Sequence, residues 1–463
     1  MRSPEQVLTA AQMRQAELAL IEGGTSVDVL MQRAGKGAAD WIWRIAAGRS
    51  VTILCGPGNN GGDGYVIAET LRRRGLAVNL VAPELPTTDA AISARNRWQG
   101  ESTDRNAHGG VFVDCLFGSG LTRPLSTEHA SLLNTLAATH DQCVAIDLPS
   151  GIATDNGAVL GAVPRFDATL ALGAWKPSHF LMPAMAFMGE RRVVDIGIAT
   201  SCHAGSVFSR PTLTAPSMDA HKYSRGLVGV VSGSMPGAAL LAAQAAMRSG
   251  AGYVKLLSQD IPAGAPAGLV IDNSPLDEVV NDKRWSAFLV GPGLGRDATA
   301  RDRLATVLER RVLTVIDADA LHIIDDDLLE GIDTSLLLFT PHEGELAALS
   351  ETFAVDESDK VSRASAVAEA TGVTVLAKGA DTVAVDRTGK LAFFPPGPSW
   401  LSVAGSGDVL AGMAASRMAA GSDAFTAAGE AVWLHAEAAR VAGPALTADD
   451  LCHAVSAGYR RFL

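Results

Sequence analysis

The sequence predicts an α/β protein of two domains, each a parallel sheet between two layers of helices. Short apolar segments alternate with segments of helical pattern along the whole chain, as in βαβ units. The 463 residues exceed one ordinary hydrophobic core, and 48% hydrophobic with 19% charged residues is a globular composition. Because residues 199–217 are linker-like, with Pro211 and Pro216, we expect domains over residues 1–205 and 206–463.

Charge and cysteine usage narrow the class of protein. A net charge of −12 argues against a nucleic-acid surface. Five scattered cysteines without a C-x-x-C pair indicate neither a disulfide framework nor a zinc site. The N-terminus lacks an apolar signal core, and no run approaches the ~18 apolar residues of a membrane span. We therefore expect a cytoplasmic enzyme that acts on small molecules and has no nucleic-acid or membrane partners. We also expect it to form a homo-oligomer.

The first half begins with helices expected over residues 8–23, with Thr9 as a possible cap, and 26–43. A strand over 50–55 then enters a glycine-rich loop at 56–64, and a helix over 65–74 leads to a strand over 77–81. This order predicts parallel pairing with a right-handed crossover. A sheet of about six strands is completed by segments 111–117, 143–147, 168–174 and 192–198.

The loop over residues 56–64 has five glycines in nine positions. Its spacing is not that of the dinucleotide fingerprint, and no Lys-Ser/Thr closes it as in a Walker loop. Asn59, Asn60 and Asp63 offer oxygen ligands, which suit a hard cation as well as a sugar or phosphate. A binding loop is therefore expected at this strand end.

Acidic residues stand at two further strand ends of the first half. Asp114 precedes the loop 118–124, and Asp147 precedes residues 148–151. A buried carboxylate is costly unless it is paired or ligates a cation, and ligands of parallel sheets bind at the carboxyl ends of the strands. The pattern indicates a site at this sheet edge, although helix capping explains either Asp alone equally well.

The second half repeats the pattern. A strand over 227–232 and a glycine turn at 233–238 lead into a helix over 239–249. The hairpin expected from alternation spans 382–386 and 390–394, with a turn at 387–389. Further strands are expected over 253–257, 287–290, 313–316, 336–339 and 374–377. Because glycines or acidic residues follow many of these strands, their loops could converge at one sheet edge.

The segment 403–412 is the strongest candidate for chemistry. The turn Gly405-Ser406-Gly407 lets backbone N–H groups approach a ligand, and the helix that follows adds unpaired N–H groups and a partial positive charge. Asp408 could take a proton from an attacking hydroxyl, or it could merely cap the helix. Structural readings also exist for other polar strand ends: a hydrogen-bonded His342, a solvated Lys378, and caps at Asp317 and Asp319.

The first half resembles the YjeF N-terminal domain, through the Asn59–Gly64 loop, Asp114 with Gly118-Ser119-Gly120-Leu121, Asp147-Leu148-Pro149-Ser150-Gly151 and the opening Thr9–Arg14. The enzymes of that family are NAD(P)H-hydrate epimerases with a Rossmann-like αβα sandwich. The resemblance implies a potassium ion held by Asn60, Asp114 and Ser150, with Asp147 as the acid/base. It implies substrate contacts from Asn59, Asn60, Gly61, Gly62, Asp63, Gly118, Ser119, Gly120, Leu121, Thr122, Arg123, Pro124 and Asp147.

The second half resembles the ADP-dependent NAD(P)H-hydrate dehydratases, which have a ribokinase-like αβα sandwich. The matching motifs are Gly291–Gly295, Asp317–Leu321, Thr340–Glu345, Lys378-Gly379 and Ala404–Gly412, with Glu343 where the family usually has Pro. The resemblance implies Asp408 as catalytic base and a magnesium ion whose ligands stay unnamed. It implies ADP contacts from Lys378, Gly379, Ala380, Asp381, Thr382 and Gly407, and hydrate contacts from Ala238, Gly293, His342 and Asp408.

Together the halves are expected to repair hydrated NADH and NADPH. The first would interconvert the R and S epimers, and the second would dehydrate the S epimer while ADP becomes AMP and phosphate. Two alternatives remain open at this point. The second half could be a small-molecule kinase, for example of a sugar or hydroxymethyl-pyrimidine, and the first half could be a non-catalytic binding module.

Overall fold

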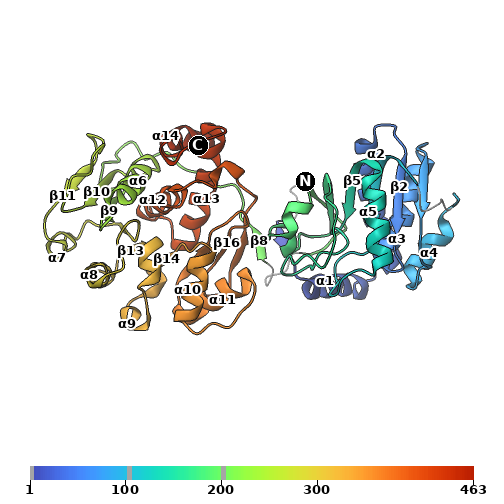
Figure 1. Ribbon diagram of the computed structural model, residues 1–463, viewed down its shortest axis with the longest axis horizontal. Helices are drawn as coiled ribbons and strands as arrows, with labels where there is room; N and C mark the ends of the chain where they lie inside the picture. Colours follow the sequence, from blue (N-terminus) through green and yellow to red (C-terminus); the bar gives the residue numbers. More distant parts are fainter. Residues whose placement is uncertain (1–4, 102–106, 200–204) are drawn as a thin grey trace. The chain divides into compact units, whose positions relative to one another are not determined.

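The computed structural model describes residues 5–101, 107–199 and 205–463. The chain divides into two compact units, Met1–Val207 and Phe208–Leu463, and each is described by itself (Figure 1). The boundary expected after residue 205 lies two residues before the observed one, which follows Val207. The assignment of one activity to each domain stays a prediction. Cys202 and part of the predicted linker lie outside the described residues.

The first unit is built on a parallel sheet in the order β3-β2-β4-β5-β6-β7, which confirms the expected sheet of about six strands. A short antiparallel pair joins β1 and β8. The elements are β1 (Gln6–Val7), α1 (Ala10–Glu22), α2 (Val27–Ala46), β2 (Val51–Cys55), α3 (Asn59–Arg73), β3 (Val78–Val81), α4 (Asp89–Arg97), β4 (Gly109–Cys115), α5 (Thr127–Ala138), β5 (His140–Ile146), β6 (Ala168–Leu172), η1 (Pro177–His179), η2 (Ala184–Phe187), β7 (Glu190–Val194) and β8 (Gly205–Val207).

Alternate residues of the central strands face two helical layers. Ile53 and Val113 pack into the core beneath α2, α3 and α4, whereas Leu54 and Phe112 pack with the residues of α5. Helices α2, α3 and α4 contact one another in sequence, and α5 contacts β4 and β5 (Figure 1). The predicted cap of the first helix is confirmed, because the Thr9 hydroxyl accepts a hydrogen bond from the backbone N–H of Gln12.

The expected glycine-rich loop is mostly helix, which corrects the sequence prediction. Helix α3 begins at Asn59, so residues 59–64 form its first turns and only 56–58 are loop. A Cβ on Gly61 would lie 1.8 Å from the carbonyl oxygen of Gly56, and one on Gly64 would lie 2.7 Å from the Cys55 sulfur. These glycines therefore allow the helix to pack directly against the end of β2, where side chains would separate them.

The second unit has a sheet in the order β17-β16-β15-β14-β13-β12-β9-β10-β11. Pairing is parallel from β15 to β11, and the predicted antiparallel hairpin β16–β17 is confirmed at one end. Strand β11 was not expected. The strands are β9 (Leu227–Val231), β10 (Tyr253–Leu257), β11 (Val270–Asp272), β12 (Ala287–Val290), β13 (Leu313–Ile316), β14 (Leu337–Phe339), β15 (Thr374–Ala377), β16 (Val383–Val385) and β17 (Leu391–Phe393).

Helices α6, α12, α13 and α14 pack on one another, and α12 contacts β9, β12 and β13. Helices α10 and α11 pack together, and α11 contacts β15 (Figure 1). The helices are α6 (Pro236–Arg248), α7 (Leu276–Val279), α8 (Ala298–Leu308), η3 (Ala318–His322), α9 (Asp326–Leu329), η4 (Thr334–Leu336), α10 (Glu343–Thr352), α11 (Lys360–Thr371), η5 (Ser399–Leu401), α12 (Ser406–Ala419), α13 (Ala424–Ala442), α14 (Ala448–Tyr459) and η6 (Arg460–Phe462).

Small residues let α12 lie close to its neighbour. A Cβ on Gly412 would lie 2.1 Å from the carbonyl oxygen of Ala242 in α6, so only glycine allows this approach. The contact fixes α12 on the sheet with its first turn at the carboxyl ends of the parallel strands. Within the described residues, no helix has the length and apolarity to cross a membrane.

Candidate active sites

The N-terminus of α12 is open to an anion. The residue before the helix is Gly405, with φ of +86° and no side-chain capping bond, and Ser406 is the first helical residue. Asp408 lies inside the first turn, so the alternative that it caps the helix is wrong. The turn that only glycine adopts easily thus leaves the first backbone N–H groups without a side-chain acceptor.

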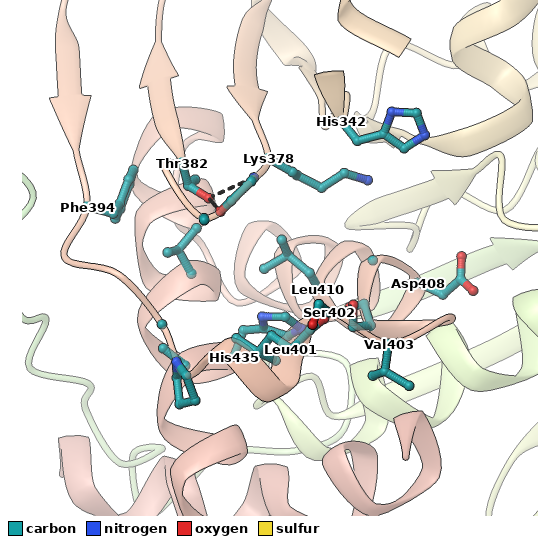
Figure 2. Close-up of a pocket in the computed structure, with 18 of the residues that line it drawn as sticks. His342, Lys378, Thr382, Phe394, Leu401, Ser402, Val403, Asp408, Leu410 and His435 are labelled. Carbon is teal, nitrogen blue, oxygen red and sulfur yellow. Dashed lines mark hydrogen bonds between the residues drawn. The ribbon is translucent and has the colours of Figure 1, made fainter. Parts of the chain in front are cut away.

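A cavity of about 550 Å³ opens at this helix end (Figure 2). One part of its wall is polar and another is apolar. The polar lining includes Asp317, His342, Glu345, Lys378, Gly379, Thr382, Ser406, Gly407 and Asp408. The apolar lining includes Phe394, Pro395, Pro398, Leu401, Val403, Leu410, Val432 and Ala436. A cavity of this size with polar groups at one end suits a nucleotide-sized ligand.

Asp408 is the titratable group of the cavity that is poised near neutral pH. Burial, together with the nearby Asp317 carboxylate, raises the pKa of Asp408 to about 7, although the Lys378 ammonium acts in the opposite direction. A carboxyl with such a pKa accepts a proton at neutral pH more readily than an ordinary aspartate. In Figure 2 the Asp408 and Lys378 side chains lie on the side of the cavity away from Phe394.

Lys378 connects the strand ends around Asp408. Its Nζ lies 2.6 Å from Oδ1 of Asp317, which also accepts a 2.8 Å hydrogen bond from the Thr340 hydroxyl. A Cβ on Gly407 would lie 3.4 Å from the same Nζ, an ordinary van der Waals contact, so the ammonium lies beside the turn. The readings of Lys378 as a solvated charge and of Asp317 as a cap are therefore both wrong: Asp317 is buried and makes no capping bond.

His342 lines the cavity and also has a structural role. It caps α10: its Nδ1 accepts a 3.1 Å hydrogen bond from the N–H of Glu345, and the Glu345 carboxylate accepts one of 2.8 Å from the N–H of His342. The imidazole is 60% exposed, so it can still meet a ligand. Glu343, the departure from the family pattern, pairs with Arg363 on α11.

Three residues expected at this site do not line the cavity. Asp381 instead binds the Lys360 ammonium at 2.6 Å. Gly293 lies on the loop after β12, and Ala238 lies in the first turn of α6. The two segments meet, because the N–H of Met235 donates to the carbonyl of Gly293 at 3.0 Å. Ala380 joins Lys378, Gly379, Thr382 and Gly407 in the lining, as expected for one group.

Sequence reasoning missed Glu345 and His435 as cavity residues. Glu345 stood in a quoted motif, but its capping partnership with His342 hid the fact that it also faces Lys378, 3.9 Å away. His435 lies in the middle of the apolar helix α13, where nothing in the local pattern distinguishes it from a core histidine.

In the first unit, Asp147 has the strained backbone of a functional residue, with φ of +64° immediately after β5. Its Oδ1 accepts hydrogen bonds from Lys176 Nζ and the N–H of Leu172, and its Oδ2 accepts one from the N–H of Ser119 at 3.1 Å. Burial acts to raise its pKa, but Lys176, together with His179 and the N–H of Leu172, outweighs burial and holds the pKa below the ordinary value. Lys176, a fully buried cation, was missed from the sequence.

The pKa of Asp63 is shifted in the opposite direction. Burial, and then the Asp147 and Glu17 carboxylates, raise the pKa of Asp63 well above its ordinary value. Two carboxyl groups whose environments push their pKa values apart are the usual pattern of an acid and a base in one site. The arrangement therefore offers Asp63 as a candidate acid and Asp147 as a candidate base.

Asp114, Ser150 and Asn60 occupy neighbouring positions beside this pair. Asp114 accepts hydrogen bonds from the N–H and the hydroxyl of Ser150, both at 2.8 Å, and burial raises its pKa to about 6. The Asn60 carboxamide is buried, and neither of its polar atoms has a hydrogen-bond partner. A Cβ on Gly118 would lie 3.3 Å from both Asn60 Oδ1 and Asp147 Oδ2. The predicted potassium ligand Asn60 and the predicted acid/base Asp147 therefore lie beside the same backbone position.

The remaining predicted residues of the first unit lie around this centre. Asn59 accepts a 2.6 Å hydrogen bond from the Thr88 hydroxyl, and the N–H of Gly120 donates to the Thr154 hydroxyl at 3.1 Å. Gly61 and Gly62 are buried in the first turns of α3. The outer part of the β4–α5 loop is partly or fully exposed and consists of Leu121, Thr122, Arg123 and Pro124.

Two αβα units, each with carboxylates gathered at the carboxyl ends of parallel strands, define a two-domain α/β enzyme. Residues 228–457 match the family model described as NAD(P)H-hydrate dehydratase, and residues 27–178 match that of the YjeF-related protein N-terminus. The chain is 34% identical over 455 residues to the bifunctional NAD(P)H-hydrate repair enzyme Nnr of Mycobacterium leprae, covering 93% of each chain. It is 31% identical over 486 residues to the Synechocystis enzyme of the same name, covering 93% of this chain and 90% of that one.

The chain belongs to the family of bifunctional NAD(P)H-hydrate repair enzymes. Among solved structures, it is similar to the ADP/ATP-dependent NAD(P)H-hydrate dehydratase of Bacillus subtilis co-crystallized with ATP/Mg²⁺, with 25% identity and a TM-score of 0.48. That match covers 54% of this chain and 95% of the Bacillus chain.

Proposed function

We propose that the protein repairs hydrated NADH and NADPH. The first unit interconverts the R and S epimers of the hydrate, and the second dehydrates the S epimer while ADP becomes AMP and phosphate. The observation that supports this most is the position of Asp408, a carboxyl with a pKa of about 7, in one cavity with the open turn Gly405–Gly407 and the Lys378 ammonium.

In the second unit, Asp408 takes the proton from the hydroxyl at C6 of the hydrated ring, and the hydroxyl oxygen attacks the β-phosphorus of ADP. The N–H groups of Gly407 and Asp408, together with Lys378, stabilise the charge of the transferring phosphoryl group, whereas the N–H of Ser406 donates to the carbonyl of Val403 at 3.3 Å. The products of this step are AMP and a phosphate ester at C6. The ring-nitrogen lone pair then expels phosphate, and loss of a proton from C5 restores the reduced nicotinamide.

The cavity lining also fits a magnesium ion. Magnesium binds through one or two carboxylates together with substrate phosphates, and Asp317 and Glu345 both line the polar end of the cavity. Such an ion would neutralise phosphate charge when ADP is bound. Within the part of the chain that the structure describes, no cluster of three or more acidic, His or Cys side chains is suited to hold a metal alone, in keeping with shared coordination by phosphate.

In the first unit, epimerisation requires that the hydroxyl leave from one face of the ring and that water add to the other. Asp63 has the raised pKa of an acid that can protonate the leaving hydroxyl, and Asp147 is the carboxylate that can take a proton from the entering water. Lys176 keeps Asp147 ionised, and the N–H of Ser119 orients it.

The residues expected to hold potassium fit such an ion. The unpartnered Asn60 carboxamide, the buried Asp114 carboxylate and the Ser150 hydroxyl are oxygen donors of the kind that hard cations prefer. Bound there, the cation would offset the cost of burying Asp114 and would hold the α3 and β4–α5 segments together. The homo-oligomer and the cytoplasmic location stay predictions.

The experiment is to incubate the protein with racemic NADH hydrate and follow the absorbance of reduced nicotinamide with ADP, with ATP and with neither. Nucleotide-dependent recovery of more than the S half of the sample, faster than spontaneous epimerisation, is expected. A kinase would instead accumulate a phosphorylated product without reduced nicotinamide. Recovery that stops at the S half would identify the first unit as a non-catalytic module.

A further inference from the structure

His435 lies in the wall of the nucleotide-sized cavity of the second unit. It belongs to α13, whose residues Val432 and Ala436 line the same cavity, and only 8% of its surface is exposed. Figure 2 shows its ring beside Leu401. Nothing in the chemistry proposed above uses this histidine.

The tautomer of His435 is determined by its surroundings. Its Nε2 lies 2.9 Å from the carbonyl oxygen of Ser406, which can only accept, so Nε2 carries the proton. Burial lowers the pKa of His435 to about 4, so the ring is neutral at pH 7 and Nδ1 presents a lone pair. Among the described residues, Nδ1 has no hydrogen-bond partner, and it is not one of the unpartnered polar atoms sealed from solvent.

The surroundings of this lone pair suit a flat apolar ring that carries one N–H donor. Phe394, Pro398, Leu401 and Val432 line this part of the cavity. Lys378 and Asp408 line the same cavity, and in Figure 2 the ammonium and the carboxylate lie apart from the His435 ring, whose Nε2 contacts the carbonyl oxygen of Ser406. A nucleotide whose phosphates occupy the polar end therefore places its base against the apolar walls, where a hydrogen-bonding partner is needed for any polar edge it buries.

We propose that Nδ1 of His435 accepts a hydrogen bond from the 6-amino group of adenine, and that this contact makes the site prefer adenine nucleotides. The inference rests on the proposed use of ADP in this cavity. Hypoxanthine would place a carbonyl oxygen against the lone pair, and unsubstituted purine would leave the lone pair buried without a donor. Either change should lower kcat/KM by about 10- to 100-fold.

The test compares ADP, IDP, purine riboside 5′-diphosphate and 2′-deoxy-ADP as co-substrates of the wild-type protein and of His435→Leu and His435→Gln. Wild type should prefer ADP to the purine analogue by about 10-fold or more. His435→Leu should bring that ratio to within about 2-fold. His435→Gln, whose amide can donate to Ser406 and accept from adenine, should restore part of the preference.

Two outcomes would overturn the assignment. If the His435→Leu change lowers the rates with ADP and the purine analogue by the same factor, the residue only positions the Ser406 carbonyl. If wild type discriminates against 2′-deoxy-ADP and loses that discrimination on substitution, the lone pair binds a ribose hydroxyl instead.

The wild-type ratios decide the question even if the leucine variant does not fold, because equal use of ADP and the purine analogue contradicts the contact. Failure of the proposed function is separable from failure of this inference. Calorimetric binding of ADP against the purine analogue measures the preference whether or not any hydrate is dehydrated.

Discussion

Replacement of Asp408 by asparagine is the sharpest test of the second site. The side chains are nearly identical in size, so the change removes the proton acceptor while keeping the packing. Because the pKa of Asp408 is about 7, the wild-type carboxyl is about nine-tenths ionised at pH 8 and can act as a base. Loss of a general base lowers a rate by about 10²- to 10⁴-fold, and we expect dehydration to fall by that factor.

The same substitution should not destabilise the fold. Burial and Asp317 raise the pKa of Asp408 from 3.8 to about 7, so its protonated form is favoured in the folded state. The contribution of protonated Asp408 to the free energy of unfolding is fully present below pH 3.8 and is lost as the pH rises through 7. Above that pH, the ionised carboxylate lowers the free energy of unfolding by roughly 2–4 kcal/mol. Asparagine carries no charge, so the variant should unfold at pH 8 at an equal or higher temperature than wild type.

The assay follows reduced nicotinamide by absorbance with the S epimer and ADP, and measures epimerisation separately by chromatography. Asp423→Asn is the matched control: Asp423 caps α13 through the N–H of Thr426, and asparagine caps equally well. A residual dehydration rate within about 3-fold of wild type would refute the role of Asp408 as base. A parallel loss of epimerisation would show instead that the variant is damaged as a whole.

Three further predictions concern pH and the first unit. Dehydration should rise with pH through about 7, falling roughly tenfold per unit below it, and the residual activity of Asp408→Asn should lack this dependence; an unchanged profile would implicate another group. Asp147→Asn keeps a partner for buried Lys176 and should leave a racemic sample half repaired; full repair at the wild-type rate would contradict its role. Gly61→Ala would place a Cβ 1.8 Å from the Gly56 carbonyl oxygen, so it should lower the free energy of unfolding by at least about 3 kcal/mol, measured by denaturant unfolding. Epimerisation should be lost under milder conditions than dehydration, and a neutral effect on stability would refute the packing argument.

The glycines of residues 56–64 show how far local pattern could lead. Their density correctly marked a special strand end, but it predicted a binding loop over residues 56–64, whereas α3 begins at Asn59. The reason for Gly61 and Gly64 is the backbone of β2 and the thiol of Cys55, and a sequence does not show which backbone lies opposite. The sequence alone does not distinguish a glycine needed for close backbone approach from a glycine needed for a turn.

Pairings between distant residues were equally invisible. Asp317 and Lys378 are 61 positions apart, yet their contact sets the charge around Asp408. In the first unit, Lys176 and Asp147 meet from segments after two different strands. Each pair exists because the carboxyl ends of parallel strands converge, and only the order of the strands in the sheet decides which residues meet.

Local pattern was enough to predict the two α/β domains, the family motifs, Asp147 at a strand end and Asp408 at a helix start, because hydrophobic periodicity and glycine turns are local properties of the chain. The pKa shifts depend on the folded structure: the pKa is raised at Asp63, lowered at Asp147 and raised to about 7 at Asp408. These shifts are caused by burial and by charges from other strands, and neither exists until the sheet has formed.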